Sequence, residues 1–197
     1  TRASLARRDL DLLAAAGALA NLAGHRRQTA WAAAGAALQL DLLSSTPAPE
    51  PRIQLGTPSE ADDLVADYAS TGLTLGRHPL ALLRPRLSAQ RFVSASRLQN
   101  SADRQLMRAA GIVTCRQRPG TATGIVFVTL EDETGLANIV VHPRLVDRQR
   151  RELLGARLLG VLGQVQREGQ VVHLIAKRLV DLTSLLGRLA TASRDFH

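Results

Sequence analysis

Cysteine, lysine and aromatic residues are nearly absent from this sequence of 197 residues. The single cysteine, Cys115, excludes an internal disulfide and a cysteine-based zinc cluster, and its strand-like apolar surroundings indicate a buried thiol. No hydrophobic run approaches the roughly 20 residues of a membrane span, and the alanine-rich start lacks the pattern of a signal peptide. We therefore expect a cytoplasmic protein. Because aromatics make up only 3% of the chain, its core must be built mainly from Leu, Val, Ile and Ala.

The charge that is present is almost entirely arginine. The chain has 25 Lys+Arg against 17 Asp+Glu, a net charge of +8, and Lys177 is its only lysine. Guanidinium groups bind phosphate as a bidentate fork and stack on bases, which favours a nucleic-acid partner. The alternative is that a GC-rich genome has replaced lysine codons with arginine codons. Composition alone leaves both explanations open.

The first part of the chain is expected to be helical. Residues 1–43 predict two short helices separated by Gly24 to Arg27, and Ser4 is a candidate N-cap for the first of them. The second helix has a basic start. Its free backbone N–H groups, together with the side chains of Arg26 and Arg27, could bind phosphate. The alternative is a plain helical hairpin with solvated arginines. Residues 44–103 predict a proline-rich linker and a helical connector, including an acidic helix start at Ser59 to Asp63.

From residue 104 the hydrophobic period changes from helical to alternating. Residues 104–182 predict strands and one helix in the order β-β-β-α-β-β, and residues 183–197 a C-terminal tail. This is the order of the OB-fold, a five-stranded Greek-key barrel, so the predicted fold class is α+β. The expected strands cover 106–115, 125–130, 137–141, 157–166 and 171–179, and the helix covers 143–154.

Three consecutive acids, Glu131 to Glu133, interrupt the strand pattern. Two-metal nucleotidyl transfer needs carboxylates that converge on ions about 4 Å apart, whereas adjacent strand residues point to opposite faces. Acids followed by Thr134 and Gly135 are instead typical of a tight hairpin. We expect a turn here, with no catalytic residues. The five histidines also lack paired metal-ligand spacing, and no phosphate-binding loop is present.

An OB barrel binds oligonucleotides across strands 2 and 3, between the loop joining strands 1 and 2 and the loop joining strands 4 and 5. Arg116 and Arg118 are expected in the first of these loops, and Arg167 in the second. Phe127 could face outward and stack on a base, or face inward as a core residue. Isolated histidines are more often structural than ligand-binding. The full set of candidate DNA-binding residues is Arg26, Arg27, Arg116, Arg118, Phe127, Thr129, Asn138, His142, Arg144, Arg167, His173 and Lys177.

The run from Arg116 to Leu189, which begins RQRPGTATGIVFVTLEDETGLANIVVHPR, resembles the C-terminal part of bacterial error-prone C-family DNA polymerases. The upstream segments TLGRHPL and AGALANLAGHRRQTAWAA resemble the same family, in the same order. These enzymes are related to the alpha subunit of DNA polymerase III and act in damage-inducible mutagenesis.

The resemblance implies the end of a helix-hairpin-helix region, a connector and an OB domain that contacts single-stranded template. The parent polymerase would use magnesium held by aspartates that this chain lacks, so we expect no cofactor here. The implied partners are single-stranded or primer-template DNA, the rest of the polymerase chain and an accessory mutagenesis protein. Residues 42–57 lack a clamp-binding pattern, and the start at Thr1 without methionine suggests a piece of a larger protein.

Two other functions compete with DNA binding. The chain could be a protein-interaction module that docks the accessory mutagenesis protein, which a pull-down without DNA would reveal. It could also carry nucleotidyl transfer itself, but the missing carboxylate set argues against this.

Overall fold

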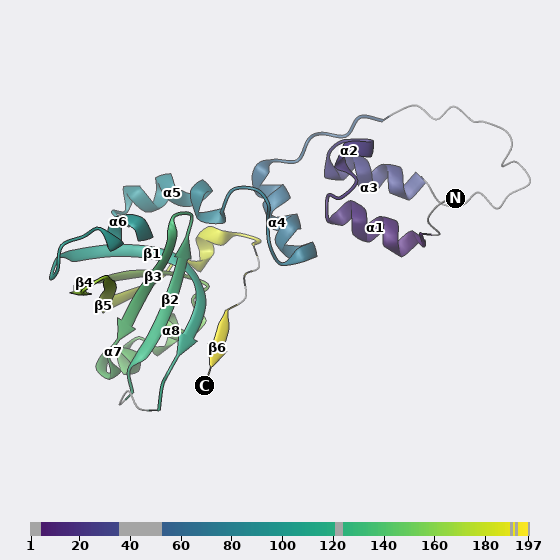
Figure 1. Cartoon of the computed structure of the whole chain (residues 1–197). Helices are drawn as coiled ribbons and strands as arrows, with labels where there is room; N and C mark the ends of the chain where they lie inside the picture. Colours follow the sequence, from purple (N-terminus) through teal and green to yellow (C-terminus); the bar gives the residue numbers. More distant parts are fainter. Residues whose placement is uncertain (1–4, 36–52, 121–123, 190, 192, 197) are drawn as a thin grey trace, which may run out of the picture. The chain divides into compact units, whose positions relative to one another are not determined.

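The computed structural model describes residues 5–35, 53–120, 124–189, 191 and 193–196 (Figure 1). The chain divides into two compact units, Thr1–Thr74 and Leu75–His197. The predicted connector, residues 44–103, is therefore shared between the two units. The prediction of an N-cap at Ser4 lies outside the described residues.

The first unit is helical. It contains α1 (Arg7–Ala15), α2 (Ala20–Ala23), α3 (Arg26–Gly35) and α4 (Glu60–Thr71). The acidic start predicted for α4 is present: Ser59 Oγ accepts the N–H of Asp62, and the Asp62 carboxylate accepts the N–H of Ser59. The helix ends at Gly72, whose φ of 76° is left-handed and suits a residue without a side chain.

The second unit begins with two short helices, α5 (Pro79–Ala89) and α6 (Ala95–Gln99). His78 caps α5, because its Nδ1 accepts the N–H of Leu80 at 3.1 Å. Ser94 caps α6 in the same way through the N–H of Arg97.

Five strands then close a barrel: β1 (Leu106–Gln117), β2 (Val126–Asp132), β3 (Gly135–Val141), β4 (Leu158–Glu168) and β5 (Val171–Asp181). The pairs β1–β2, β2–β3, β4–β5 and β1–β4 are antiparallel, and a parallel β3–β5 pair completes the circuit. With a helical segment between β3 and β4, this is the OB-fold order, so the predicted fold is confirmed.

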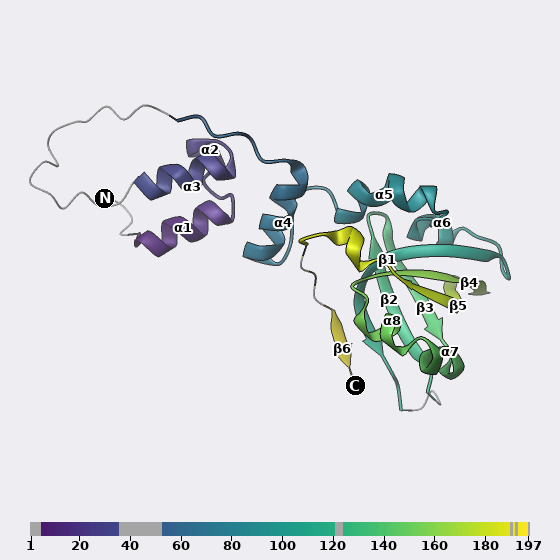
Figure 2. The ribbon, with the colours of Figure 1, turned by 180° about the vertical axis from the view of Figure 1, so that it is seen from behind.

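Two features of the barrel differ from the prediction. The expected single helix at 143–154 is split into α7 (Pro143–Arg148) and α8 (Arg150–Gly155), because Gln149 between them has non-helical dihedrals. Beyond a short 3₁₀ turn, Thr183–Leu186, the tail adds a short strand, β6 (Arg194–Phe196), which pairs in parallel with β1. In both views α7 and α8 lie at the lower end of the barrel (Figure 2).

Alternation along the strands builds the core. On β2, Val126, Val128 and Leu130 are buried, while Phe127 and Thr129 between them are only half-buried. The inward aliphatic side chains of the five strands join Leu145, Val146 and Leu153 from α7 and α8 in one cluster. This burial of apolar surface is the main stabilising force of the barrel, and it leaves the odd-numbered residues of β2 on the outer surface.

Candidate nucleic-acid interface

Strand register places the candidate residues in rows on the outer surface of the barrel. One row is polar: Thr129 on β2 lies opposite Asn138 on β3, and Asn138 lies opposite His173 on β5. Cys115 on β1 and Gln166 on β4 extend this row at its two ends. Four of the five side chains can donate or accept hydrogen bonds as neutral groups, so the row suits contacts that need no fixed charge.

The neighbouring row is apolar and carries the aromatic side chain. Phe127 lies opposite Val140 on β3 and Gln117 on β1, and Val140 lies opposite Ile175 on β5. Of the two alternatives for Phe127, the structure therefore shows the outward one, with the ring half-buried beside Val140. A half-buried ring beside an aliphatic side chain still offers part of its surface to a stacking base.

Cations gather at one end of this aromatic row. A side chain at Gly124 would lie 3.3 Å from Cγ of Pro143 and 3.6 Å from a guanidinium nitrogen of Arg118, so the β1–β2 loop passes beside the start of α7. His142 and Arg144 flank Pro143 in the sequence, and both are exposed, as is Arg118. Within the described residues, neither arginine makes an ion pair or hydrogen bond, which leaves both guanidinium groups available to phosphate.

Arg116 does not belong to this group, and its predicted place in the loop is wrong. It lies in β1 and is 6% exposed. Its Nε donates to the carbonyl oxygen of Leu153 at 2.7 Å, and its other nitrogens donate to the carbonyl of Ala156 and to Ser193 Oγ. The guanidinium thus satisfies backbone carbonyls at the C-terminal end of α8, so the side chain is structural.

Arg167 is also committed to the fold, and it lies in β4 rather than in the predicted loop. Its guanidinium donates to the carbonyl oxygens of Gln99 and Ser101, and its N–H donates to Asp103 Oδ1 at 3.0 Å. It therefore fixes the end of α6 against β4. The same side chain lines a cavity of about 470 Å³ together with Asn138 and Gln170.

The acidic triplet forms the predicted hairpin between β2 and β3, and it does more than turn the chain. Asp132 is 5% exposed and, with Glu133, holds Arg84 of α5: Oδ2 of Asp132 lies 2.9 Å from one guanidinium nitrogen, and Oε1 of Glu133 lies 2.5 Å from another. Asp132 Oδ2 also accepts the N–H of Ala95 at 2.7 Å, at the start of α6. The hairpin therefore anchors α5 and α6, a role that the turn prediction missed because Arg84 lies 48 residues before Asp132 in the sequence.

Burial and charge have opposite effects within this cluster. Burial disfavours the guanidinium of Arg84, but hydrogen bonds and attraction to Glu133 and Asp132 raise its pKa above the ordinary value. Burial lowers the pKa of His78 below 6.5, even though the carboxylates of Glu131, Glu133 and Asp132 favour its charged form. A neutral His78 fits its geometry, because Nδ1 is a hydrogen-bond acceptor.

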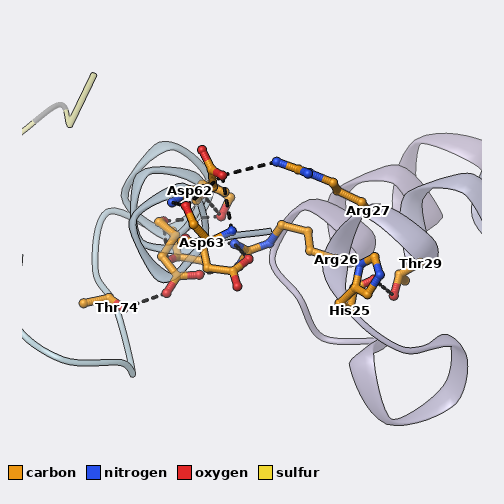
Figure 3. A network of polar contacts seen from close by, with 12 residues as sticks. His25, Arg26, Arg27, Thr29, Asp62, Asp63 and Thr74 are labelled. Atoms are coloured by element: carbon orange, nitrogen blue, oxygen red, sulfur yellow. Dashed lines mark hydrogen bonds and ion pairs between the residues drawn. The ribbon is translucent and has the colours of Figure 1, made fainter. Parts of the chain in front are cut away.

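In the helical unit, Arg26 and Arg27 face carboxylates of α4 (Figure 3). The Arg26 guanidinium donates to the Asp63 carbonyl at 2.8 Å and pairs with the carboxylates of Asp63 and Asp67. Arg27 lies 3.2 Å from Asp62 Oδ2. Both predicted phosphate ligands are thus already paired with acids.

The remaining candidates, His173 and Lys177, lie on β5. Nδ1 of His173 is buried without a hydrogen-bond partner in the described part of the chain. Lys177 is exposed beside Arg178, away from the row of Phe127 and Val140. Thr129, Asn138, Phe127, Arg118, His142 and Arg144 therefore make up the surface that we call the β2–β3 face.

Comparison with known proteins adds the relationship that geometry alone does not show. Over 196 residues, and all of its own length, the chain is 66% identical to 18% of an error-prone DNA polymerase from Azoarcus sp. and 65% identical to 19% of one from Dechloromonas aromatica. The chain matches a segment of the bacterial error-prone DNA polymerases. It thus spans less than a fifth of the length of these polymerases, and the resemblance seen in its sequence is confirmed.

The likeness to solved structures is weaker than the sequence likeness to the polymerases. Asparaginyl-tRNA synthetase from Pyrococcus horikoshii aligns with 46% of the chain and 23% of its own length, at 21% identity and a TM-score of 0.40. No family model matches the chain.

Two kinds of site are not found among the described residues of the chain. Its described residues contain no group of three or more His, Cys, Asp or Glu side chains placed to hold a metal ion. None of its described helices has the length and apolar character needed to cross a bilayer.

Proposed function

We propose that this chain is the part of an error-prone DNA polymerase that binds single-stranded template DNA on the β2–β3 face. The observation that carries the proposal is the outward ring of Phe127, in register with Val140 and near exposed arginines. The match over the whole chain to error-prone DNA polymerases supplies the context. Nucleotidyl transfer with magnesium, in damage-induced DNA repair synthesis in the cytoplasm, would belong to the complete enzyme.

The chemistry of this face predicts the mode of binding. A base would stack on Phe127, while Arg118 and Arg144 would neutralise phosphates at the loop end of the face. The amide of Asn138 and the hydroxyl of Thr129 would contact base edges or sugars. Because stacking and phosphate contacts are largely independent of sequence, we expect little sequence preference.

A salt titration with a fluorescently labelled oligonucleotide tests the proposal. Affinity should fall steeply with salt, and Phe127→Ala should weaken binding about fivefold or more at low salt, through loss of stacking. Leu154→Ala is the control, because Leu154 is another large apolar side chain that reaches the surface, but it lies on α8. The proposal fails if the chain does not bind DNA at low salt, or if Phe127→Ala binds as tightly as the Leu154 variant.

A further inference from the structure

A second surface, on strands β1, β4 and β5, combines an apolar floor with three cations. A pocket of about 340 Å³ is lined by Leu106, Met107 and Leu162 and by Arg108, Lys177 and Arg178. Its volume lies at the lower end of the range of about 300–1,000 Å³ for ligand sites. We call it the cationic pocket.

Strand register explains why the cations meet there. Leu162 of β4 lies between Arg108 of β1 and Arg178 of β5 in one cross-strand row. The β4–β5 register then shifts, because Gly163 pairs with Ala176 and leaves Lys177 as an extra residue. Such a bulge turns two successive side chains toward one face, and both Lys177 and Arg178 are exposed.

Gly163 makes this close bulge possible. A Cβ on it would lie 2.4 Å from the carbonyl oxygen of Ile175, which is closer than any real side chain tolerates. The missing side chain lets β4 and β5 approach at the bulge and keeps Lys177 and Arg178 beside Leu162.

The cations of the pocket lack protein counter-charges. None of the described residues that line it is acidic, and neither Lys177 nor Arg178 forms a hydrogen bond or ion pair within the described chain. Arg108 donates once, to the carbonyl oxygen of Gln90 at 3.3 Å. Three neighbouring cations repel one another, so an anionic partner would be attracted to the pocket.

The floor of the pocket indicates which anion fits. Its uncharged side chains are aliphatic or thioether groups, and Leu106 is 68% exposed. Single-stranded nucleic acid is held by aromatic stacking platforms, and none of these lining residues is aromatic. An aliphatic floor inside a cationic rim instead complements a peptide in which acidic residues flank one or two apolar side chains.

We propose that the cationic pocket is a docking site for an acidic, apolar-centred peptide segment of a partner protein. The site is separate from the β2–β3 face and does not depend on DNA binding there. The apolar side chains of the segment would contact Leu106 and Leu162, and its carboxylates would pair with Lys177, Arg178 and Arg108.

Fluorescence anisotropy of a labelled peptide, with Asp and Glu around a central Leu–Phe pair, tests the site on the 197-residue chain. We expect saturable binding that weakens at least about fivefold in the double variant Lys177→Ser with Arg178→Ser, through loss of two charge contacts. The matched control is Arg150→Ser with Arg151→Ser, two successive exposed arginines on α8, which should leave affinity unchanged. A peptide with Ser–Ser in place of Leu–Phe should bind at least about fivefold more weakly.

Several outcomes would overturn the proposal. These are an absence of peptide binding, equal weakening by the control pair, or equal binding of the Ser–Ser peptide. If the Lys177 and Arg178 variant instead weakens binding of a labelled oligonucleotide and not of the peptide, the surface belongs to nucleic acid. If it only dissociates a dimer in sedimentation, the surface belongs to a second copy of the chain. Loss of oligonucleotide binding in Phe127→Ala, with peptide binding intact, separates this test from that of the proposed function.

Discussion

The two compact units of the chain carry opposite charge. Residues 1–74 contain six Lys/Arg against eight Asp/Glu, a net charge of −2, whereas residues 75–197 contain 19 against nine, a net charge of +10. The overall charge of +8 therefore conceals a mildly acidic helical unit and a strongly basic barrel unit. The net positive charge that favours a nucleic-acid partner therefore belongs to the barrel unit alone.

The units also use their charged side chains differently. In the helical unit Arg7, Arg26 and Arg27 each pair with an aspartate. The barrel unit places acids such as Asp132 in its interior contacts and leaves many cations exposed without counter-charges. The difference shows that the same residue type is paired within the fold in one place and left exposed in another, according to its neighbours. The exposed cations that carry this contrast are Arg118, Arg144, Arg150, Arg151, Lys177 and Arg178.

The largest expected effect is a loss of stability, and it compares a buried aspartate of the barrel unit with an exposed aspartate of the helical unit. Asp132→Ala should lower the free energy of unfolding of the barrel unit by about 3 kcal/mol, because it removes the buried acceptor of the Ala95 N–H and one of the two carboxylates that pair with Arg84. Asp11→Ala, which removes an exposed pair with Arg7, should cost about 0.5 kcal/mol or less.

Urea denaturation measures both variants. Far-UV circular dichroism follows the strands of the barrel unit, and fluorescence of Trp31, the one tryptophan, follows the helical unit. A double-mutant cycle with Arg84→Met isolates the pairing energy. Equal losses for Asp132→Ala and Asp11→Ala would remove the distinction between buried and exposed acids.

The next prediction compares two arginines two residues apart. Arg116→Met should lower the free energy of unfolding by about 2 kcal/mol, since the carbonyls of Leu153 and Ala156 lose their donor. Arg118→Met should change stability by less than about 0.5 kcal/mol but reduce the slope of log affinity for oligonucleotide against log salt by about one.

Urea denaturation measures the stability of the Arg116→Met and Arg118→Met variants, and salt titration of oligonucleotide binding measures their slopes. Binding by Arg116→Met is measured under conditions in which the variant remains folded. The assignment of Arg116 to structure would be wrong if its variant kept full stability and lost the salt slope. If the Arg118→Met variant bound oligonucleotide with an unchanged slope of log affinity against log salt, Arg118 would not be a phosphate contact of the β2–β3 face.

These two arginines also show what sequence reasoning can reach. The alternation of Val126, Val128 and Leu130 predicts β2, whereas the sequence leaves open the side on which Phe127 lies, and the strand register of the structure shows it. The sequence prediction for Arg116 is wrong because it ends the first strand at residue 115, whereas β1 continues to Gln117. The β1–β2 register also shifts between Val113 and Cys115, which reverses the alternation and turns Arg116 inward. A bulge of this kind leaves no clear mark in residue types, because it depends on how the paired strand aligns.

Contacts between segments that lie far apart in the sequence are the second kind of feature that the sequence does not predict. The Glu131 to Glu133 turn was predicted from local chemistry, and local chemistry was sufficient for it. Its pairing with Arg84 depends on how α5 packs against the hairpin, which no short-range pattern encodes. The cationic pocket was missed for the same reason, because it joins three strands and depends on the extra residue at Lys177.

A third prediction tests whether the helical unit takes part in DNA binding. Arg26→Met should lower the stability of that unit by about 1 kcal/mol, because its guanidinium holds Asp63 and Asp67 of α4. Affinity for oligonucleotide and its salt slope should stay unchanged. Arg8→Met is the control, since Arg8 is exposed on α1 and makes no ion pair with any described residue.

Trp31 fluorescence during urea denaturation measures the stability, and anisotropy measures the affinity. A fall in DNA affinity comparable to that of Arg118→Met would show that Arg26 reaches phosphate despite its acidic partners. In that event the two units would share the DNA contact, and the contrast between them would fail.

The smallest expected effect is a pH dependence confined to the barrel unit. Burial holds the pKa of His78 below 6.5, against the pull of Glu131, Glu133 and Asp132 and with Arg84 adding to the depression. Because the folded state disfavours the proton, the unfolded state binds more protons in this range. Stability is therefore full above about pH 6.5 and falls as the pH drops from there through the pKa of the folded state.

His78→Asn separates this titration from the cap itself, because an Asn side chain can accept the N–H of Leu80 but does not titrate. Melting followed by far-UV circular dichroism between about pH 5 and 8 should show a smaller loss of stability in the variant than in the wild type. The slope should arise in the barrel unit, so Trp31 fluorescence should not follow it. An identical pH dependence in both proteins would mean that His78 is not the group that titrates.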